Sequence, residues 1–192
     1  SMMVAQNGPG ITNFVTPVKT AYWNHTPLLL VTPQAANKTL GQGGFQEVEQ
    51  MALFEDMVAY QEEVRDPSRI AETLNRVILQ AKRASAPAQI NVPRDFWTQV
   101  IDIELPAIVE FERPSGGEDA IAAASEMLSN AEFPVMLNGA GVVIGGAIEA
   151  SIKLAERLDA PVCCGYQHND AFPGTHPLFA GPLGYNGSKA GM

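Results

Sequence analysis

The sequence has 192 residues, of which 12 are Lys or Arg and 21 are Asp or Glu, so its formal net charge is −9 at pH 7. Its 46% hydrophobic content and mean hydropathy of −0.01 are typical of a globular α/β protein and exclude disordered, collagen-like and coiled-coil classes. The basic residues form no cluster, which argues against nucleic-acid binding, and no apolar run approaches the roughly 18 residues of a membrane span.

The N-terminus and the cysteines indicate a cellular compartment. Residues 1–5 lack the basic region and the long apolar stretch of a signal peptide, which predicts a cytoplasmic protein. Cys163 and Cys164 are adjacent in an apolar run. Because neighbouring residues point to opposite faces of a strand, a disulfide between them would be strained, and we expect two reduced thiols.

Short β-like runs alternate with helical stretches along the chain, which predicts parallel strands joined by crossover helices. The aliphatic run at 28–32 suits a strand covered on both faces, and Asp66-Pro67-Ser68 is a typical helix start. In chain order, the first half is predicted to hold a strand at 3–6, a glycine turn at 7–10, a helix at 12–23, a strand at 28–32, a loop at 33–44, a helix at 47–54, a strand at 57–60, a helix at 68–84 and a strand at 88–92.

Residues 98–117 form an acidic, proline-containing stretch, which predicts a linker between a domain at 1–97 and a second domain at 118–192. Because the chain begins inside a predicted strand and stops inside a predicted loop, we expect it to be truncated at both ends. The second domain is predicted to hold a helix at 118–130, a strand at 134–138, a glycine turn at 139–141, a helix at 146–158, a strand at 161–164 and a loop-rich end.

Two glycine-rich segments of the first domain could carry chemistry. The turn from Asn7 to Asn13 stands between a strand and a helix, where a ligand can approach the backbone, although such tight turns also need glycine for structural reasons. The segment from Gly41 to Glu47 presents an aromatic ring, an amide and a carboxylate in a row, which suits a loop that folds over a substrate. The alternative is a surface loop with Phe45 as its hydrophobic anchor.

A third segment, Leu137 to Gly146, approximates a dinucleotide fingerprint, but Ile144 stands where the third glycine belongs. Tight packing of a Rossmann-like domain is therefore the favoured interpretation. No metal site is predicted, because His25, His168 and His176 lack metal-ligand spacing. The sequence also has no GxSxG elbow and no P-loop, which excludes serine hydrolases of that type and P-loop NTPases.

The first two segments, in this order, resemble the pyrimidine-binding domain of thiamine-diphosphate enzymes of the acetolactate synthase group. Residues 118–186 likewise resemble the start of the central domain of that family. The resemblance implies an α/β protein with an N-terminally truncated, parallel-sheet pyrimidine-binding domain followed by part of a Rossmann-like central domain. The matching motifs are Gly8-Pro9-Gly10-Ile11-Thr12-Asn13, Ala21-Tyr22, Pro27 to Val31, Phe45-Gln46-Glu47 and Pro93-Arg94-Asp95.

Within this group, residues 6–10, 21–27 and 37–47 are most similar to the sulfoacetaldehyde acetyltransferases, which convert sulfoacetaldehyde and phosphate into acetyl phosphate and sulfite. The resemblance implies that Gly8, Pro9 and Asn13 line the aminopyrimidine of the cofactor, and that Phe45 and Gln46 face the reacting carbon. Lys38 is a candidate for holding the sulfonate or phosphate. Acetolactate synthase or a related 2-oxoacid enzyme is the alternative, and a nucleotide-binding or assembly module without catalysis is the alternative from another class.

The resemblance also indicates what the chain lacks. In this family an activating glutamate precedes the Gly-Pro-Gly turn, and a Gly-Asp-Gly motif that holds magnesium and the diphosphate lies in a third domain; no Gly-Asp-Gly occurs here. We therefore expect a middle fragment, inactive alone, of an enzyme that uses thiamine diphosphate and magnesium on a small-molecule substrate. Because active sites of this group lie between subunits, a homo-oligomer is also expected.

Overall fold

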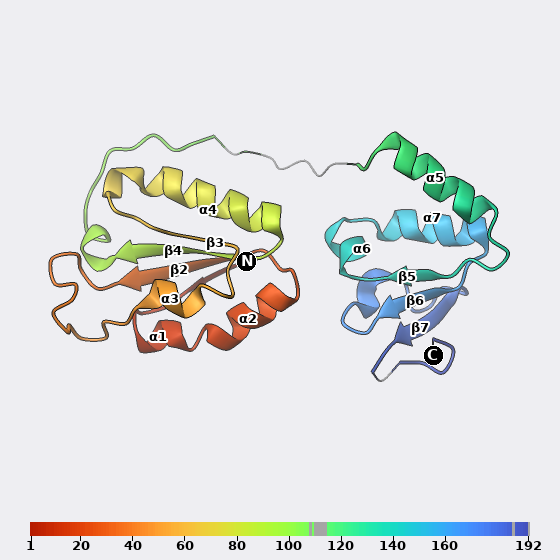
Figure 1. Ribbon diagram of the computed structural model, residues 1–192, viewed down its shortest axis with the longest axis horizontal. Coiled ribbons are helices and arrows are strands. Elements are labelled where there is room, and N and C mark those ends of the chain that lie inside the picture. The colour runs from red at the N-terminus through yellow and green to blue at the C-terminus, as the bar shows by residue number, and fades with distance from the viewer. Residues whose placement is uncertain (108, 110–114, 186, 192) are drawn as a thin grey trace. The chain divides into compact units, whose positions relative to one another are not determined.

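The computed structural model describes residues 1–107, 109, 115–185 and 187–191. The chain divides into two compact units, residues 1–113 and 114–192 (Figure 1). The predicted linker at 98–117 falls partly outside the described residues, and the domain bounds predicted at 97 and 118 stay a prediction. Each unit is an α/β structure with a parallel sheet, as the sequence predicts.

The first unit is built on a four-stranded parallel sheet of order β1-β2-β4-β3. Its strands are β1 (Met2–Val4), β2 (Leu28–Gln34), β3 (Tyr60–Glu63) and β4 (Pro87–Pro93). Its helices are α1 (Pro9–Thr12), α2 (Val15–Trp23), α3 (Gln50–Phe54) and α4 (Ile70–Ala84), with 3-10 turns at Pro67–Arg69 and Arg94–Phe96.

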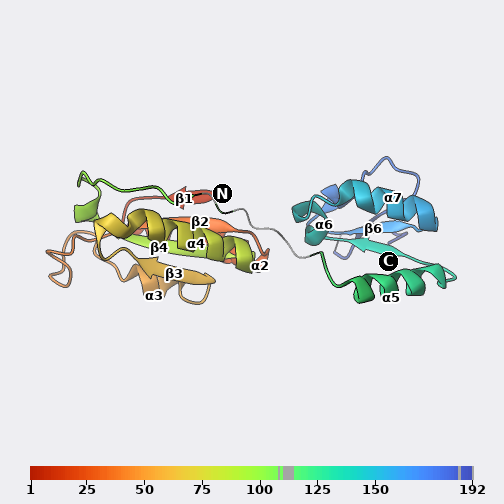
Figure 2. The same cartoon turned by 90° about the horizontal axis from the view of Figure 1, so that it is seen from above.

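The strand order explains the placement of the helices. From β1 through β2 to β3 the chain moves in one direction across the sheet, and from β3 to β4 it steps back. Because parallel crossovers are right-handed, the reversal of direction places α4 on the opposite face from α2 and α3. Figures 1 and 2 show α4 on one face of the sheet and α1, α2 and α3 on the other.

Each face of the sheet has its own apolar core. Leu28 and Leu30 of β2 pack with Phe54 on the α3 side. On the other face, Ile90 of β4 packs with Val77 of α4. Since side chains alternate along a strand, Gln89 and Asn91 of β4 face the α3 side, where the functional segments lie.

The predicted helix at 12–23 is two helices, because α1 ends at Thr12 and α2 begins at Val15. Pro17 lies in the first turn of α2. Proline has no N–H to donate, and its ring opposes a preceding helical turn, so it is tolerated only near a helix start. The helix therefore begins again two residues before Pro17.

The predicted strand at 57–60 is wrong in position. Met57 and Val58 are buried with Phe54 in the apolar core, and the strand that pairs with β4 is Tyr60–Glu63. β3 is an edge strand, so it accepts charged residues, and Glu62 pairs with Arg76 of α4. The apolar pattern thus marked the buried segment that precedes the strand.

Two element boundaries on either side of the loop that carries Phe45 also differ from the prediction. β2 continues to Gln34 although Pro33 lies within it, because β1 ends opposite Val31 and leaves β2 paired on one side only. The helix predicted at 47–54 begins at Gln50, with the Glu49 side chain accepting a hydrogen bond from the N–H of Met51.

The second unit has a three-stranded parallel sheet of order β5-β6-β7. Its strands are β5 (Met136–Asn138), β6 (Val162–Gly165) and β7 (Phe179–Leu183), and its helices are α5 (Glu118–Ser129), α6 (Ala140–Ile144) and α7 (Ile148–Leu158), with a 3-10 turn at Asn169–Ala171. Cys163 and Cys164 are buried free thiols on β6, which confirms the prediction. Among the described residues, no helix is both long and apolar enough to cross a bilayer.

The second unit corrects two further predictions. The helix predicted at 146–158 begins at Ile148, and the separate short helix α6 ends before Gly146, which has a left-handed φ of 64°. The predicted loop-rich end contains β7, whose Gly181 and Pro182 are residue types that strands usually avoid. They are tolerated because β7 lies at the edge of the sheet.

Candidate functional site

The glycine turn and the Phe-Gln-Glu loop meet at the carboxyl end of the first sheet. The Asn7 amide donates to the carbonyl oxygen of Gln46 at 3.0 Å, and the Gln6 amide donates to Gln46 Oε1 at 2.8 Å. Gly8 has a left-handed φ of 69°, and a Cβ on it would lie 2.6 Å from the Gln46 carbonyl oxygen. Only glycine fits this approach, so the two segments form one site.

Gln46 itself adopts a strained backbone, with a φ of 60°. Left-handed conformations are costly for non-glycine residues and persist only where the surroundings hold them. Here the contacts from Gln6 and Asn7 hold Gln46. Its Nε2 donates no hydrogen bond within the described residues, so these N–H groups are available to an acceptor on a ligand.

Phe45 projects into solvent with 81% of its surface exposed. The alternative interpretation, in which this ring anchors the loop hydrophobically, is therefore wrong. An exposed ring beside the Gln46 amide presents an apolar surface and polar donors side by side, which suits a small ligand with both kinds of group.

Two carboxylates hold the loop that carries Phe45. The Glu47 carboxylate accepts from the N–H of Gly41 at 2.6 Å and from the N–H of Gly44 at 3.0 Å. Asp95, which follows β4, accepts from the N–H of Asn37 at 3.1 Å. Charge-assisted bonds of this kind are about twice as strong as neutral ones, so the loop is pre-organised at its start and along its glycines.

A buried polar cluster lies beneath this contact, between the sheet and α3. Gln50 is fully buried; its Oε1 accepts from the N–H of Gly8 at 3.3 Å, and its Nε2 donates to the Pro33 carbonyl at 2.7 Å. Asn91 accepts from Thr32 Oγ1 at 2.7 Å and donates to a Glu63 carboxylate oxygen at 2.7 Å. Buried polar groups that bond one another in this way define a single arrangement.

This cluster was missed from the sequence. A period-2 signal was available, because Thr32 and Gln34 of β2 and Gln89 and Asn91 of β4 are polar positions inside strands of otherwise apolar character. All four are buried on the α3 side of the sheet. Gln89 Oε1 has no hydrogen-bond partner within the described residues.

The remaining predicted site residues lie on the exposed side of the turn and loop. Pro9 is exposed, and its carbonyl accepts from Asn13 Nδ2 at 2.6 Å and from Thr12 Oγ1 at 3.1 Å. Lys38 is also exposed, and its backbone carbonyl accepts from the Gln42 amide at 3.3 Å. The structure thus joins Gly8 to Gln46 and Pro9 to Asn13, and it leaves the Lys38 ammonium without a bonded partner among the described residues.

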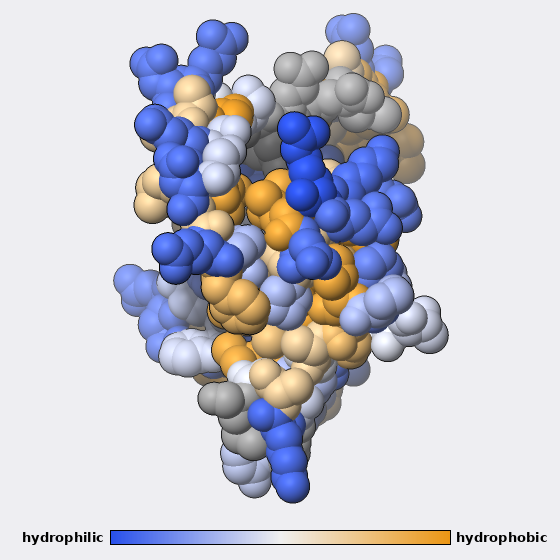
Figure 3. All heavy atoms as spheres, turned by 90° about the vertical axis from the view of Figure 1, so that its right-hand side faces the viewer, coloured by the Kyte–Doolittle hydropathy of each residue, from blue (hydrophilic) through white to orange (hydrophobic). Residues whose placement is uncertain are grey.

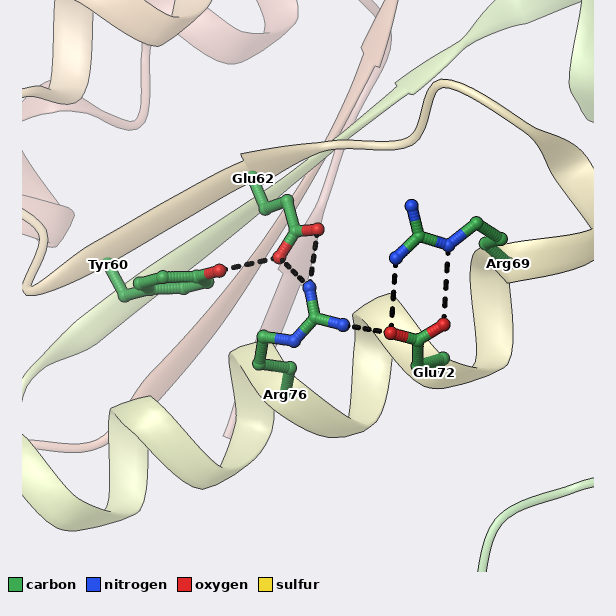
Figure 4. Close-up of polar contacts among 5 residues, drawn as sticks. All are labelled: Tyr60, Glu62, Arg69, Glu72 and Arg76. Atoms are coloured by element: carbon green, nitrogen blue, oxygen red, sulfur yellow. Dashed lines mark hydrogen bonds and ion pairs between the residues drawn. The ribbon is translucent and has the colours of Figure 1, made fainter.

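A cleft of about 560 Å³ lies on the other side of the loop, between β3 and the start of α4, and it is lined by none of the predicted site residues. Its walls include Glu62 and Arg69, members of an ion-pair ladder (Figure 4). Arg76 donates to both oxygens of Glu62, at 2.7 and 2.9 Å, and also to Glu72, while Arg69 donates to Glu72 at 3.1 Å.

The ladder ties β3 to α4 and explains several shifted pKa values. Hydrogen bonds from Arg69 lower the pKa of Glu72, and the bond to Glu62 raises the pKa of Tyr60. Since opposite charges are already matched along the ladder, we regard it as structural and place the candidate site at the contact between Gly8 and Gln46.

The structure does not support tight packing as the reason for the glycines at 139 and 141 of the third segment. A Cβ on Gly139 or Gly141 would meet no atom within 4 Å, so tight packing does not require those glycines; at Gly145 it would lie 2.7 Å from a carbonyl oxygen. Asn138 instead joins the elements, donating to Ser151 Oγ at 2.7 Å. The described residues bring together no group of three His, Cys, Asp or Glu side chains that could ligate a metal.

Two family profiles match the chain. Residues 1–53 match "Thiamine pyrophosphate enzyme, N-terminal TPP binding domain", and residues 121–192 match "Thiamine pyrophosphate enzyme, central domain". The chain belongs to the thiamine pyrophosphate enzymes. Gly8 and Gln46, which form the contact of the candidate site, both lie within the residues that match the N-terminal domain.

This thiamine pyrophosphate enzyme chain is similar to curated relatives over its whole length. It is 82% identical over 192 residues to the sulfoacetaldehyde acetyltransferase of Roseovarius nubinhibens, and 34% identical over 97% of the chain to a probable acetolactate synthase large subunit of Methanocaldococcus jannaschii. The chain spans about a third of the length of these relatives, 32% and 33% respectively.

A solved structure agrees with the fold. The thiamine diphosphate-dependent 4-hydroxybenzoylformate decarboxylase of Rhodococcus jostii RHA1 is 26% identical and superposes with a TM-score of 0.83, covering 95% of this chain and 36% of that one. The parallel-sheet arrangement of this thiamine pyrophosphate enzyme chain is thus shared with a thiamine diphosphate-dependent decarboxylase.

Proposed function

We propose that the chain is part of a thiamine-diphosphate-dependent acyltransferase that converts sulfoacetaldehyde and phosphate into acetyl phosphate and sulfite. The observation that carries this proposal is the 82% identity, over all 192 residues, to the Roseovarius nubinhibens sulfoacetaldehyde acetyltransferase. Acetolactate synthase is the weaker candidate, because the relative of that name is only 34% identical.

The residues of the site fit the aminopyrimidine end of thiamine diphosphate. Pro9 exposes an apolar ring, and Asn13 and Gln46 bring amides to the same edge of the sheet, a combination that suits a flat ring with hydrogen-bonding nitrogens. When bound, thiamine diphosphate supplies the carbon nucleophile that allows an aldehyde carbon to be transferred as an acyl unit.

The chain's own residues would orient the reacting groups. The Gln46 N–H groups would donate to a substrate oxygen, and the Phe45 ring would cover the small acyl group. Glu47 would act through the backbone of the loop, because it bonds Gly41 and Gly44 and holds Phe45 in place. These roles use positions that exist before a ligand arrives, as pre-organisation requires.

Magnesium, a homo-oligomeric assembly and a cytoplasmic location belong to the same proposal. In the whole enzyme, magnesium would bind with the diphosphate through residues of another domain. Self-association is supported by apolar surface, because Val135, Leu137 and Leu154 of the second unit are exposed, and Figure 3 shows apolar side chains between hydrophilic ones on this unit. Light scattering at several protein concentrations tests the assembly, and a constant mass of 20.6 kDa would contradict it.

A chimaera tests the activity. The 192 residues replace the aligned segment of the Roseovarius nubinhibens enzyme, and formation of acetyl phosphate and sulfite is measured with thiamine diphosphate and magnesium present. We expect turnover comparable to the unaltered relative. A folded chimaera that forms acetolactate from pyruvate, and no acetyl phosphate from sulfoacetaldehyde, would refute the proposal.

A further inference from the structure

A cleft of about 300 Å³ opens at the carboxyl end of the first sheet, where β1, β2 and β4 end. In open parallel sheets this edge is the usual position of ligand sites. The cleft is lined by Val4, Gln6, Asn7, Pro33, Arg94 and Trp97.

The cleft adjoins the candidate site through two of its walls. Gln6 and Asn7 both line it, and both donate hydrogen bonds to Gln46, at 2.8 and 3.0 Å. A molecule in the cleft would therefore lie next to Gln46, whose own N–H groups have no acceptor among the described residues.

Arg94 supplies the charge of the cleft. It follows β4 directly, its side chain is exposed, and within the described part of the chain its guanidinium makes neither a hydrogen bond nor an ion pair. Arg69 and Arg76 differ, because both are engaged in the ladder of Figure 4. Asp95 forms no ion pair with Arg94 in the described part of the chain, and its carboxylate accepts instead from the N–H of Asn37.

Trp97 is the aromatic residue among those that line the cleft. Its indole N–H donates to the Val92 carbonyl at 3.3 Å, which fixes the ring at the end of β4. These groups together suit a small oxyanion. The planar Arg94 guanidinium, with its several N–H donors, and the two amides would bind the charged oxygens, and the indole would contact the apolar part of the ligand.

We propose that the Arg94 cleft binds the oxyanion of the substrate, a sulfonate or a phosphate, beside Gln46. This deepens the proposed function and rests on it for the identity of the anion. The sequence offered Lys38 as the residue that holds the anion. The proposal gives this role to Arg94, because Arg94 lines the cleft and Lys38 does not.

Fluorescence of Trp97 tests the proposal in the 192-residue chain. Trp23 is the other tryptophan of the chain and is 77% exposed, so the measurement uses a Trp23→Phe background. Inorganic phosphate, 2-hydroxyethanesulfonate and acetate are titrated separately at constant ionic strength. We expect a saturable change with phosphate or the sulfonate, and the stronger of these two identifies the source of the anion.

Three variants make the test specific. Arg94→Gln should weaken binding about tenfold or more, because it removes charge-assisted hydrogen bonds, and Arg94→Lys should recover part of the loss. Lys38→Gln removes an equal charge from a nearby loop and should leave binding unchanged. Circular dichroism verifies that each variant is folded.

The proposal is overturned if neither anion gives a saturable change, if Arg94→Gln binds as well as the parent, or if Lys38→Gln causes the larger loss. The outcome is independent of the proposed function, because anion binding is measured without thiamine diphosphate. A chimaera that lacks acetyl phosphate formation would refute the function alone and leave the cleft assignment standing.

Discussion

The carbonyl oxygen of Gln46 lies where a side chain on Gly8 would be, 2.6 Å from the position of a Cβ. This close approach joins two segments that are far apart in the chain, and the bond from Asn7 to the same oxygen, at 3.0 Å, reinforces it. Any side chain on Gly8 must therefore displace the loop or strain the turn.

Gly8→Ala should lower the free energy of unfolding by about 2 kcal/mol or more, because it combines a left-handed φ with a steric clash. Gly43→Ala is the matched control, since Gly43 has a φ of 70° but open space around a Cβ. Gly43→Ala should lower the free energy of unfolding by about 1 kcal/mol. Urea unfolding measures both, and equal losses would show that the clash has no energetic weight.

Glu47→Gln should loosen the loop without unfolding the protein. The carboxylate holds the N–H groups of Gly41 and Gly44, so hydrogen exchange at these two amides should accelerate about tenfold. In the chimaera, kcat should fall with little change in KM. Glu55→Gln removes the same charge elsewhere and should alter neither; unchanged exchange in Glu47→Gln would contradict the clamp.

Gln46→Ala in the chimaera should lower kcat, because it removes the N–H donors beside the reacting groups. Phe45→Ala should change the stability by less than about 0.5 kcal/mol, since the ring is 81% exposed, while still affecting turnover. Steady-state kinetics and urea melts separate these effects. If both variants had the kcat and KM of the parent, the loop would not be part of the active site.

Gln50→Ala should be strongly destabilising, by about 2 to 4 kcal/mol, because it leaves the Pro33 carbonyl and the Gly8 N–H without their buried partner. Gln42→Ala is the control, since this amide is exposed in the loop and makes one bond of 3.3 Å. It should cost little. If both variants lost a similar amount of unfolding free energy, the hydrogen bonds of the buried cluster would not be a special source of stability.

Acid should destabilise the 3-10 turn Pro67–Arg69, which Asp66 caps and which leads into α4. The Ser68 hydroxyl, and then the Ser68 N–H, lower the pKa of Asp66 below its ordinary value of 3.8. A pKa lowered on folding gives stability that is present above the ordinary value and is lost as the pH falls through the lowered one. Asp66→Asn should therefore flatten the dependence of the urea midpoint on pH below about 4, whereas the charge-matched Asp102→Asn should not.

The sequence by itself determined the alternation of strands and helices and the long helix α4. Asp66 caps the 3-10 turn Pro67–Arg69 that leads into α4, and the apolar spacing of α4 buries Val77 and Ala81. Both are local signals that need no knowledge of distant residues. The motifs from Gly8 to Asn13 and from Phe45 to Glu47 were also visible, because a family resemblance depends on residue order alone.

Only the tertiary structure decided which of those residues touch. β3 was not predictable as a strand, because Glu62 is stabilised there by Arg76, a partner on another element. The burial of Gln50 on α3 and Asn91 on β4 likewise depends on hydrogen bonds to residues of other elements. The contact between Gly8 and Gln46 belongs to the same class: periodicity and propensity report on near neighbours in sequence, whereas these bonds form only after the strands are in register.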